Sequence, residues 1–233
     1  MRKVDPADVR ADFESASKDI VEYFNRVVAV VAVSPSKERD TSQLATQSFL
    51  ALFVAFERFI SDLVLAYLNR DFSVFQAALH ARVSSSVRER FGDGVHSLLS
   101  LKTHAHVRMT DLEAIVDPTG WNLTFPSIEK LKSFASNSLA AAHAARITSI
   151  SVSEARLIET ARAVRNFVAH QSVGSKKLMN DALSTVEVGN HNRHLGRGVN
   201  EVHTVGSYLK AVHAGQRRLH RYSIGLLAIS SHM

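Results

Sequence analysis

Residues 160–170 contain two side chains that together can cut a phosphodiester bond. Arg165 is always positively charged, and His170, five positions later, belongs to the residue type that transfers protons near neutral pH. Asn166 directly follows the arginine and is suited to orient a phosphate or an imidazole. Because RNA supplies its own nucleophile, the 2′-hydroxyl, these groups need only move protons and stabilise negative charge. The expected reaction is metal-independent RNA cleavage that leaves a 2′,3′-cyclic phosphate and spares DNA.

The element that must position these residues is an amphipathic helix, predicted over residues 153–171. Its apolar positions share one stripe at helical spacing: Leu157, Ala161, Val164 and Val168. Arg165 and His170 bracket the polar face and lie about 140° apart in projection. Arg162 precedes Arg165 by about one turn and is expected to hold an adjacent phosphate. Since this face is wide, a second copy of the helix would close the site better than one copy alone.

The spacing of the two residues is weak evidence on its own. The chain is rich in arginine and has 12 histidines, so about one Arg-x4-His match is expected by chance. A structural alternative for His170 is a helix-end histidine that interacts with the carbonyl groups there. The amphipathic helix, the neighbouring Asn166 and the basic sequence that follows favour the catalytic interpretation.

Composition narrows the class of protein. The chain has 233 residues, 45% of them hydrophobic, which is enough to bury a core. It has no cysteine, which excludes disulfides, thiolate zinc sites and cysteine nucleophiles. Its longest apolar run, residues 49–56, is too short to cross a bilayer, and the first residues lack an apolar signal core. We therefore expect a cytoplasmic protein without a membrane partner.

The net charge of +6 is unevenly distributed, because the entire excess lies at or after Arg162. Such a basic region is typical of a protein that binds a polyanion, here RNA, although a merely basic domain would look the same. A last long helix is predicted over residues 202–229. On its polar side it carries a basic stripe, an RNA-binding candidate or simply a solvated face: Lys210, His213, Arg217, His220 and Arg221.

Histidines also gather in the loop of residues 190–203 and at His104 and His106. Imidazoles on a flexible loop can bind zinc, but no carboxylate stands at a fixed spacing from them. We therefore predict no metal site and no cofactor, and interpret the loop as a positively charged RNA contact.

Apolar spacing throughout the chain is helical, and strand alternation is scarce. The pattern predicts an all-α bundle of about six helices in one domain, 1–233, with an N-terminal helical extension (1–39) and a core (40–230). Besides the two helices above, segments expected to be helical lie at residues 13–27, 45–67, 72–91 and from 126 onwards. Gly92 and Gly94 close the third of these, residues 101–126 form an irregular connection, and Gly174 ends the Arg/His helix before a loop over 174–201.

The segment from Arg165 to His170 resembles the Arg-polar-x3-His signature of the HEPN superfamily of helical ribonucleases, most closely its RiboL-PSP type. Upstream, residues 56–59 stand where that family has its long second helix, and one helix follows the motif helix. The resemblance covers residues 40–230, but only the motif helix is specific. Glu57, within that upstream segment, is either a polar partner for the motif arginine or merely the end of the apolar run.

The resemblance implies a homodimer in which two motif helices face each other and form a composite endoribonuclease site. It also implies a toxin or antiviral-defence role, with a neutralising antitoxin or a defence-complex partner. Toxins silenced by nucleotidyltransferase antitoxins carry a tyrosine two residues after the motif histidine, where this chain has Ser172, so that mode of silencing is in doubt. The alternatives are a catalytically inactive HEPN-fold RNA-binding or scaffold protein, and a metal-dependent hydrolase.

Overall fold

The computed structural model describes residues 3–104, 106–117 and 123–233. Within these residues the chain is all-α apart from one short hairpin, with ten α-helices where about six were expected. The chain divides into two compact units. One contains Met1–Val9 and Ile60–Ser149, and the other contains Arg10–Phe59 and Ile150–Met233. Helix α1 (Pro6–Val31) and helix α2 (Lys37–Arg70) each have residues in both units.

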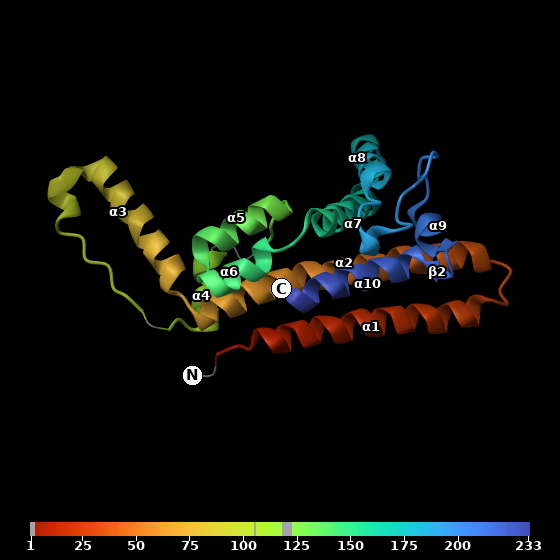
Figure 1. Cartoon of the computed structure of the whole chain (residues 1–233), viewed down its shortest axis with the longest axis horizontal. Coiled ribbons are helices and arrows are strands. Elements are labelled where there is room, and N and C mark those ends of the chain that lie inside the picture. Colours follow the sequence, from red (N-terminus) through yellow and green to blue (C-terminus); the bar gives the residue numbers. More distant parts are fainter. Residues whose placement is uncertain (1–2, 105, 118–122) are drawn as a thin grey trace. The chain divides into compact units, whose positions relative to one another are not determined.

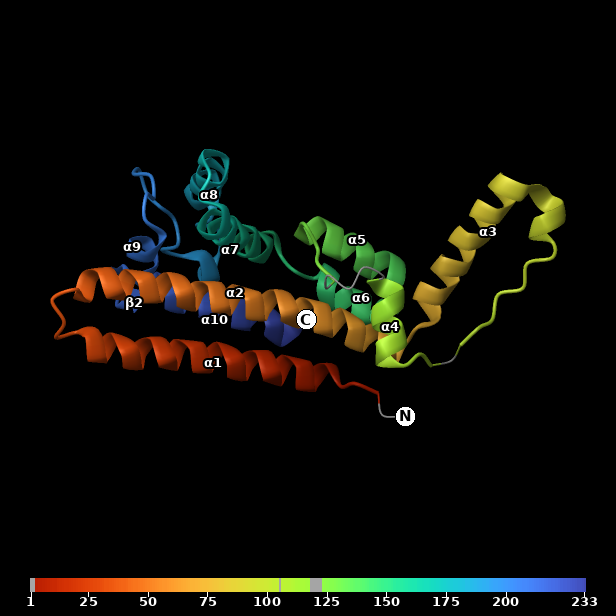
Figure 2. The same ribbon diagram turned by 180° about the vertical axis from the view of Figure 1, so that it is seen from behind.

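The second unit is built around aromatic residues of α2. Here α1, α2 and α10 (Arg218–His232) run side by side, as both ribbon views show (Figures 1 and 2). Phe49 packs edge-on against Tyr222 of α10, and Phe56 packs edge-on against Phe13 of α1. All four rings are almost completely buried. The rings therefore form the hydrophobic core that holds the three helices together.

The motif helix α7 (Val152–His170) packs against this core. Ser151 caps its N-terminus in a capping box with Glu154, two positions before the expected cap at Ser153. Gly225 of α10 lies so close to α7 that a Cβ atom there would come within 2.5 Å of Leu157. A glycine at this position thus permits the close approach of the two helices.

The first unit contains the end of α2 and four further helices: α3 (Ser73–His96), α4 (Met109–Val116), α5 (Ile128–Ser138) and α6 (Ala141–Thr148). Leu112 of α4, Leu131 of α5 and Ile147 of α6 are buried in its core. Helix α3 bends at Gly92, whose φ of 79° is a left-handed conformation, but helical structure resumes and runs to His96. The glycines therefore kink the helix that they were expected to close. The connection expected over residues 101–126 instead contains α4, while residues 118–122 lie outside the described part.

The prediction of a loop over residues 174–201 was wrong for the first half of that range. Helix α8 (Val173–Thr185) occupies it, and Gly174 lies in the first turn of this helix instead of ending α7. The left-handed position after α7 is taken by Gln171, with a φ of 49°. Ser172 then caps α8, so the two helices are joined by only two residues. The remaining part of the loop contains a short 3-10 turn, η1 (Asn190–Asn192).

The prediction of one continuous last helix over residues 202–229 was also wrong. Helix α9 (Val205–Lys210) ends at Lys210, and a hairpin of β1 (Val212–His213) and β2 (Gln216–Arg217) precedes α10. Val212 pairs with Arg217 and His213 with Gln216. Ala214 and Gly215 both have positive φ at the turn, the conformation that a two-residue hairpin needs. No helix in the described residues is long and apolar enough to cross a membrane.

Candidate active site

Arg165 is fixed by two hydrogen bonds on the polar side of α7. Its Nη2 donates to Oε2 of Glu57 on α2 at 2.7 Å, and its Nη1 donates to Oδ1 of Asn166 at 2.9 Å. The side chains of Arg165 and Glu57 are 32% and 27% exposed, so the pair lies at the edge of the core and within reach of a ligand. Glu57 is therefore the polar partner of the motif arginine, the first of its two interpretations.

His170 is the last residue of α7 and is exposed. Within the described residues its side chain makes no hydrogen bond or ion pair. It lies about 7.5 Å further along the helix axis than Arg165, given the usual rise per residue. The structure therefore places both residues on one helix with His170 accessible, but does not bring them into contact within one copy of the chain.

Arg162 is engaged by a neighbour on its own helix. Its Nη1 lies 3.0 Å from a carboxylate oxygen of Glu159, and its side chain is only 17% exposed. A phosphate would have to compete with this carboxylate, so RNA binding by Arg162 stays a prediction.

The predicted basic stripe of the last helix does not exist as one helical face, because the hairpin divides it. Lys210 ends α9 and donates from Nζ to a carboxylate oxygen of Glu38 at 2.6 Å. Arg217 on β2 donates to the carbonyl of Lys210, and its guanidinium lies 5.7 Å from the ring centre of Phe24. Arg221 on α10 donates to the carbonyl of His213 at 2.7 Å. These contacts with the chain itself give each cation a structural role.

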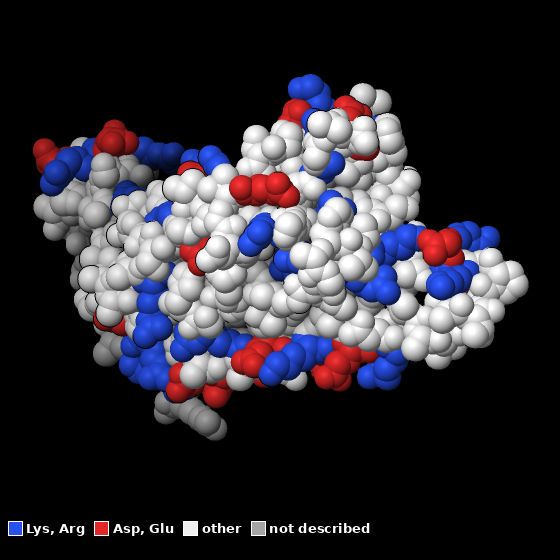
Figure 3. All heavy atoms as spheres, turned by 45° about the vertical axis from the view of Figure 1, so that its right-hand side comes forward, with Lys and Arg blue, Asp and Glu red and all other residues white. Residues whose placement is uncertain are grey.

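Surface charge around these elements is mixed. On the face shown in the space-filling view, Asp and Glu lie among the Lys and Arg side chains (Figure 3). Burial and the nearby Arg218 lower the pKa of His213 below its usual range, and burial and Arg217 lower the pKa of His220. Both shifts favour the neutral imidazole and so reduce the positive charge that these histidines contribute. RNA contacts by these residues remain a prediction.

The histidines of the region 190–203 are dispersed. His191 lies in η1, His194 stacks at 6.4 Å on His213, and Nδ1 of His203 lies 2.9 Å from Nζ of Lys176. In the part of the chain that the structure describes, no three His, Asp or Glu side chains come together as a metal site.

Sequence reasoning missed the residue that holds this region in place. Arg218 is 9% exposed and donates to three backbone carbonyls, those of His194, Gly196 and Tyr208. Its guanidinium also lies 4.6 Å from the ring centre of Tyr208, whose hydroxyl donates to the carbonyl of Leu195 at 2.6 Å. Its role had little signal in the sequence, because Arg218 is one of three arginines between residues 217 and 221 and only its burial distinguishes it.

The chain was compared with protein families, curated proteins and solved structures. No protein-family model, curated protein or solved structure matches this chain. The functional interpretation thus depends on the chemistry and geometry of the residues themselves.

Proposed function

We propose that this protein is a metal-independent endoribonuclease of HEPN type, with Arg165, Asn166 and His170 as its catalytic residues. The observation that carries the proposal is the arrangement on α7. An arginine oriented from two sides by Glu57 and Asn166 lies on the same helix as a freely accessible histidine. Fixing a guanidinium before substrate arrives lowers the cost of aligning it with a phosphate.

In the proposed reaction, an imidazole of His170 removes the proton from the 2′-hydroxyl of RNA. The 2′-oxygen then attacks the adjacent phosphorus, and the bond from phosphorus to the 5′-oxygen breaks. An imidazolium protonates the departing 5′-oxygen, while Arg165 stabilises the negative charge on the phosphorane oxygens. The products are a 2′,3′-cyclic phosphate and a 5′-hydroxyl.

One copy of α7 does not supply a second, opposed proton donor, which supports a homodimer with two motif helices facing each other. Three exposed apolar side chains of the same unit are available to such an interface. Val173 and Leu178 on α8 are 89% and 66% exposed, and Val54, three residues before Glu57 on α2, is 55% exposed. We propose that burying them against a second copy contributes to the interface in which the two α7 helices face each other.

A second candidate function is an inactive HEPN-fold RNA-binding or scaffold protein. The same ion pair favours it, because Glu57 already neutralises the charge that Arg165 would offer to a phosphate. For the nuclease, the phosphate must draw the guanidinium away from Glu57 or share it, since an arginine has five donors.

The deciding experiment incubates the purified chain with total and transfer RNA in EDTA, beside Arg165→Ala, His170→Ala and the control Arg156→Ala. Arg156 is an exposed residue of α7 outside the proposed site. We expect cleavage by the wild type and by the control only, with cyclic phosphate ends. Equal cleavage by the His170 variant would remove the motif from the mechanism. An inactive wild type that still binds RNA would favour the second candidate.

A toxin or antiviral-defence role in the cytoplasm, with a neutralising antitoxin or defence-complex partner, belongs to the same proposal. It requires that expression of the wild type slows growth of the host and that His170→Ala restores it. Growth arrest that persists in the His170 variant would disconnect toxicity from the motif.

A further inference from the structure

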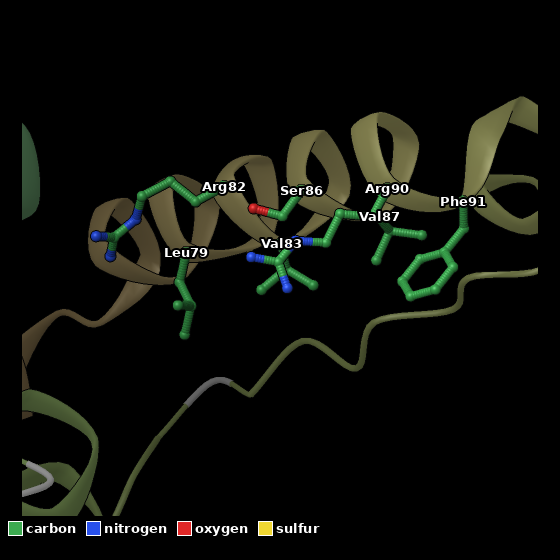
Figure 4. Close-up of a pocket in the computed structure, with 7 residues that line it drawn as sticks. All are labelled: Leu79, Arg82, Val83, Ser86, Val87, Arg90 and Phe91. Atoms are coloured by element: carbon green, nitrogen blue, oxygen red, sulfur yellow. The ribbon is translucent and has the colours of Figure 1, made fainter.

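The distal half of α3 carries an apolar row that the described residues cover only in part, since Leu79, Val83 and Val87 are half-buried and Phe91 is exposed. Leu79, Val83, Val87 and Phe91 recur at every fourth position, so they follow one side of the helix. Figure 4 shows Leu79, Val83 and Phe91 extending from the same side of α3. Phe91 is 64% exposed, and the buried residues of α3 are confined to Phe75 and Gln76 at its start. A helix gains most of its stability by packing its apolar face, so this row is suited to a partner.

This row forms the floor of a groove. A hollow of about 410 Å³ lies along residues 79–91, and a second of about 390 Å³ lies between α3, α4 and side chains from residues 102–104 and 106–108. Leu79 lines both hollows, so they adjoin on one face of α3. Phe72 and Ile115 continue the apolar floor in the second hollow.

The rim of the groove is positively charged. Arg82 and Arg90 flank the apolar row, and Lys102 and Arg108 line the second hollow. All four are exposed, and in the described residues none forms an ion pair with a carboxylate. Asp111 is the single acidic residue among the described residues that line the two hollows. The groove thus has four positively charged side chains around an apolar floor and only one acidic residue among those that line it.

Two buried amides hold the far wall of the groove. The Gln76 side chain donates to the carbonyl of Lys102 at 3.0 Å and accepts from the backbone N–H of His104 at 3.1 Å. Asn69 donates from its side chain to the carbonyl of Val107 at 3.0 Å. Because these bonds tie the segment to α2 and α3, the wall is formed before any partner arrives.

We propose that this groove binds an acidic amphipathic helix of a partner protein, whose apolar residues recur at every third or fourth position. The row from Leu79 to Phe91 is about 18 Å long, which matches three to four turns of a docked helix. Glutamates or aspartates on both sides of its apolar stripe would face the four cations of the rim. This inference does not depend on the proposed nuclease, because none of its residues belongs to that site.

The four cations alone would attract any polyanion, including RNA. The apolar floor is the feature that favours an acidic amphipathic helix as the ligand. An RNA backbone gains affinity from phosphate contacts and gains nothing from valines along a helix. A helix in a groove needs both the apolar anchors and the complementary rim. Removing a floor residue must therefore weaken binding as surely as removing a rim charge.

The test measures fluorescence anisotropy of a labelled amphipathic peptide of about 16 residues, long enough for the groove. The peptide has leucine at i, i+4 and i+7 spacing with glutamate on both flanks. A lysine version of the same peptide and a scrambled glutamate version are the controls. Each is titrated with the full chain, with Arg82→Glu/Arg90→Glu, with Phe91→Ala, and with Arg146→Glu, an exposed arginine on α6 outside the groove.

We expect the glutamate peptide to bind the wild type and the Arg146 variant alike. Binding should weaken at least about tenfold for the double charge reversal and for Phe91→Ala. The charge-reversed variant should in turn prefer the lysine peptide. Equal binding of the scrambled peptide, or no change in either groove variant, would overturn the proposal. A labelled 12-nucleotide RNA that loses affinity with the arginines but not with Phe91, while the peptide does not bind, would assign the face to nucleic acid.

Discussion

Glu57 of α2 and Arg165 of α7, 108 residues apart in the sequence, are joined by a hydrogen bond of 2.7 Å between a carboxylate and a guanidinium. The contact connects the long aromatic helix of the core with the helix that carries the candidate catalytic residues. It thereby fixes the direction in which Arg165 points. The contact should also contribute to the stability of the folded chain.

A double-mutant cycle with Glu57→Gln and Arg165→Met should give a coupling energy of roughly 1 kcal/mol in the free energy of unfolding by urea. The pair is about one-third exposed, so solvent screens it less than a surface pair and more than a buried one. A cycle on the exposed pair Lys18 and Glu14 of α1, whose coupling should be smaller, serves as the control. Equal coupling energies in both cycles would show that the Glu57–Arg165 pair stabilises the fold no more than an exposed surface pair does.

Arg165→Lys keeps the charge but loses the planar fork that reaches Glu57 and Asn166 together. We expect the rate of RNA cleavage to fall at least about tenfold, because the cation is no longer aligned. The Kd for an uncleavable 2′-deoxy analogue should change by less than about threefold. Arg156→Lys should leave both values unchanged. A lysine variant with the wild-type rate would show that charge alone suffices.

Gln171→Gly should stabilise the fold by about 0.5–1 kcal/mol, because glycine adopts the left-handed conformation at this position without steric cost. Ala169→Gly, two residues earlier and still helical, should instead destabilise it by about 1 kcal/mol. Urea unfolding of the two variants and the wild type measures this opposite pair of effects. Destabilisation by both glycines would mean that Gln171 has contacts of its own.

Stability should fall as the pH drops from 7.5 to 5.5. Burial lowers the pKa of His143, His213 and His220 below the ordinary value of about 6.5. The unfolded chain therefore binds protons first as the pH falls through that value, and protonation favours unfolding. The full contribution is present above about pH 6.5 and decreases below it.

The Tm measured at pH 7.5, 6.5 and 5.5 tests this dependence, with His220→Phe as the variant. His220 packs edge-on against Phe24 at 5.9 Å, and its Nε2 is buried without a partner, so a phenyl ring fits the site. The variant should lose less Tm on acidification than the wild type. If the variant loses as much Tm between pH 7.5 and pH 5.5 as the wild type does, groups other than His220 cause the pH dependence.

Much of the helical frame was predictable because long apolar spacings are unambiguous. The helices at residues 13–27, 45–67 and 72–91 and the motif helix all exist. The second of these and the motif helix bury a stripe of apolar side chains, whereas α3 buries only Phe75 and Gln76. The pairing of Glu57 with Arg165 was one of two interpretations, because a single glutamate at the end of an apolar run does not show which element faces it.

The errors lie where backbone conformation was assigned to the wrong residue. Gly174 was taken as the helix stop, but Gln171 adopts the left-handed conformation and glycine is tolerated in the first turn of α8. Ala214 likewise has a positive φ at the hairpin that interrupts the last helix. Neither residue type signals such a conformation, so only tertiary packing reveals it. The predicted basic stripe fails for the same reason. Its residues share one face only if residues 202–229 form an unbroken helix, and the hairpin interrupts that helix.

The guanidinium of Arg218 donates to backbone carbonyl oxygens, which every residue carries, and thus places no demand on the side chains of the loop that it holds. Val199 in this loop is 96% exposed. Since the chain contains no cysteine, Val199→Cys would provide a unique thiol on an anchored loop of the unit that contains α7. A fluorophore or spin label attached there would report the meeting of two copies without altering the residues proposed to cut RNA.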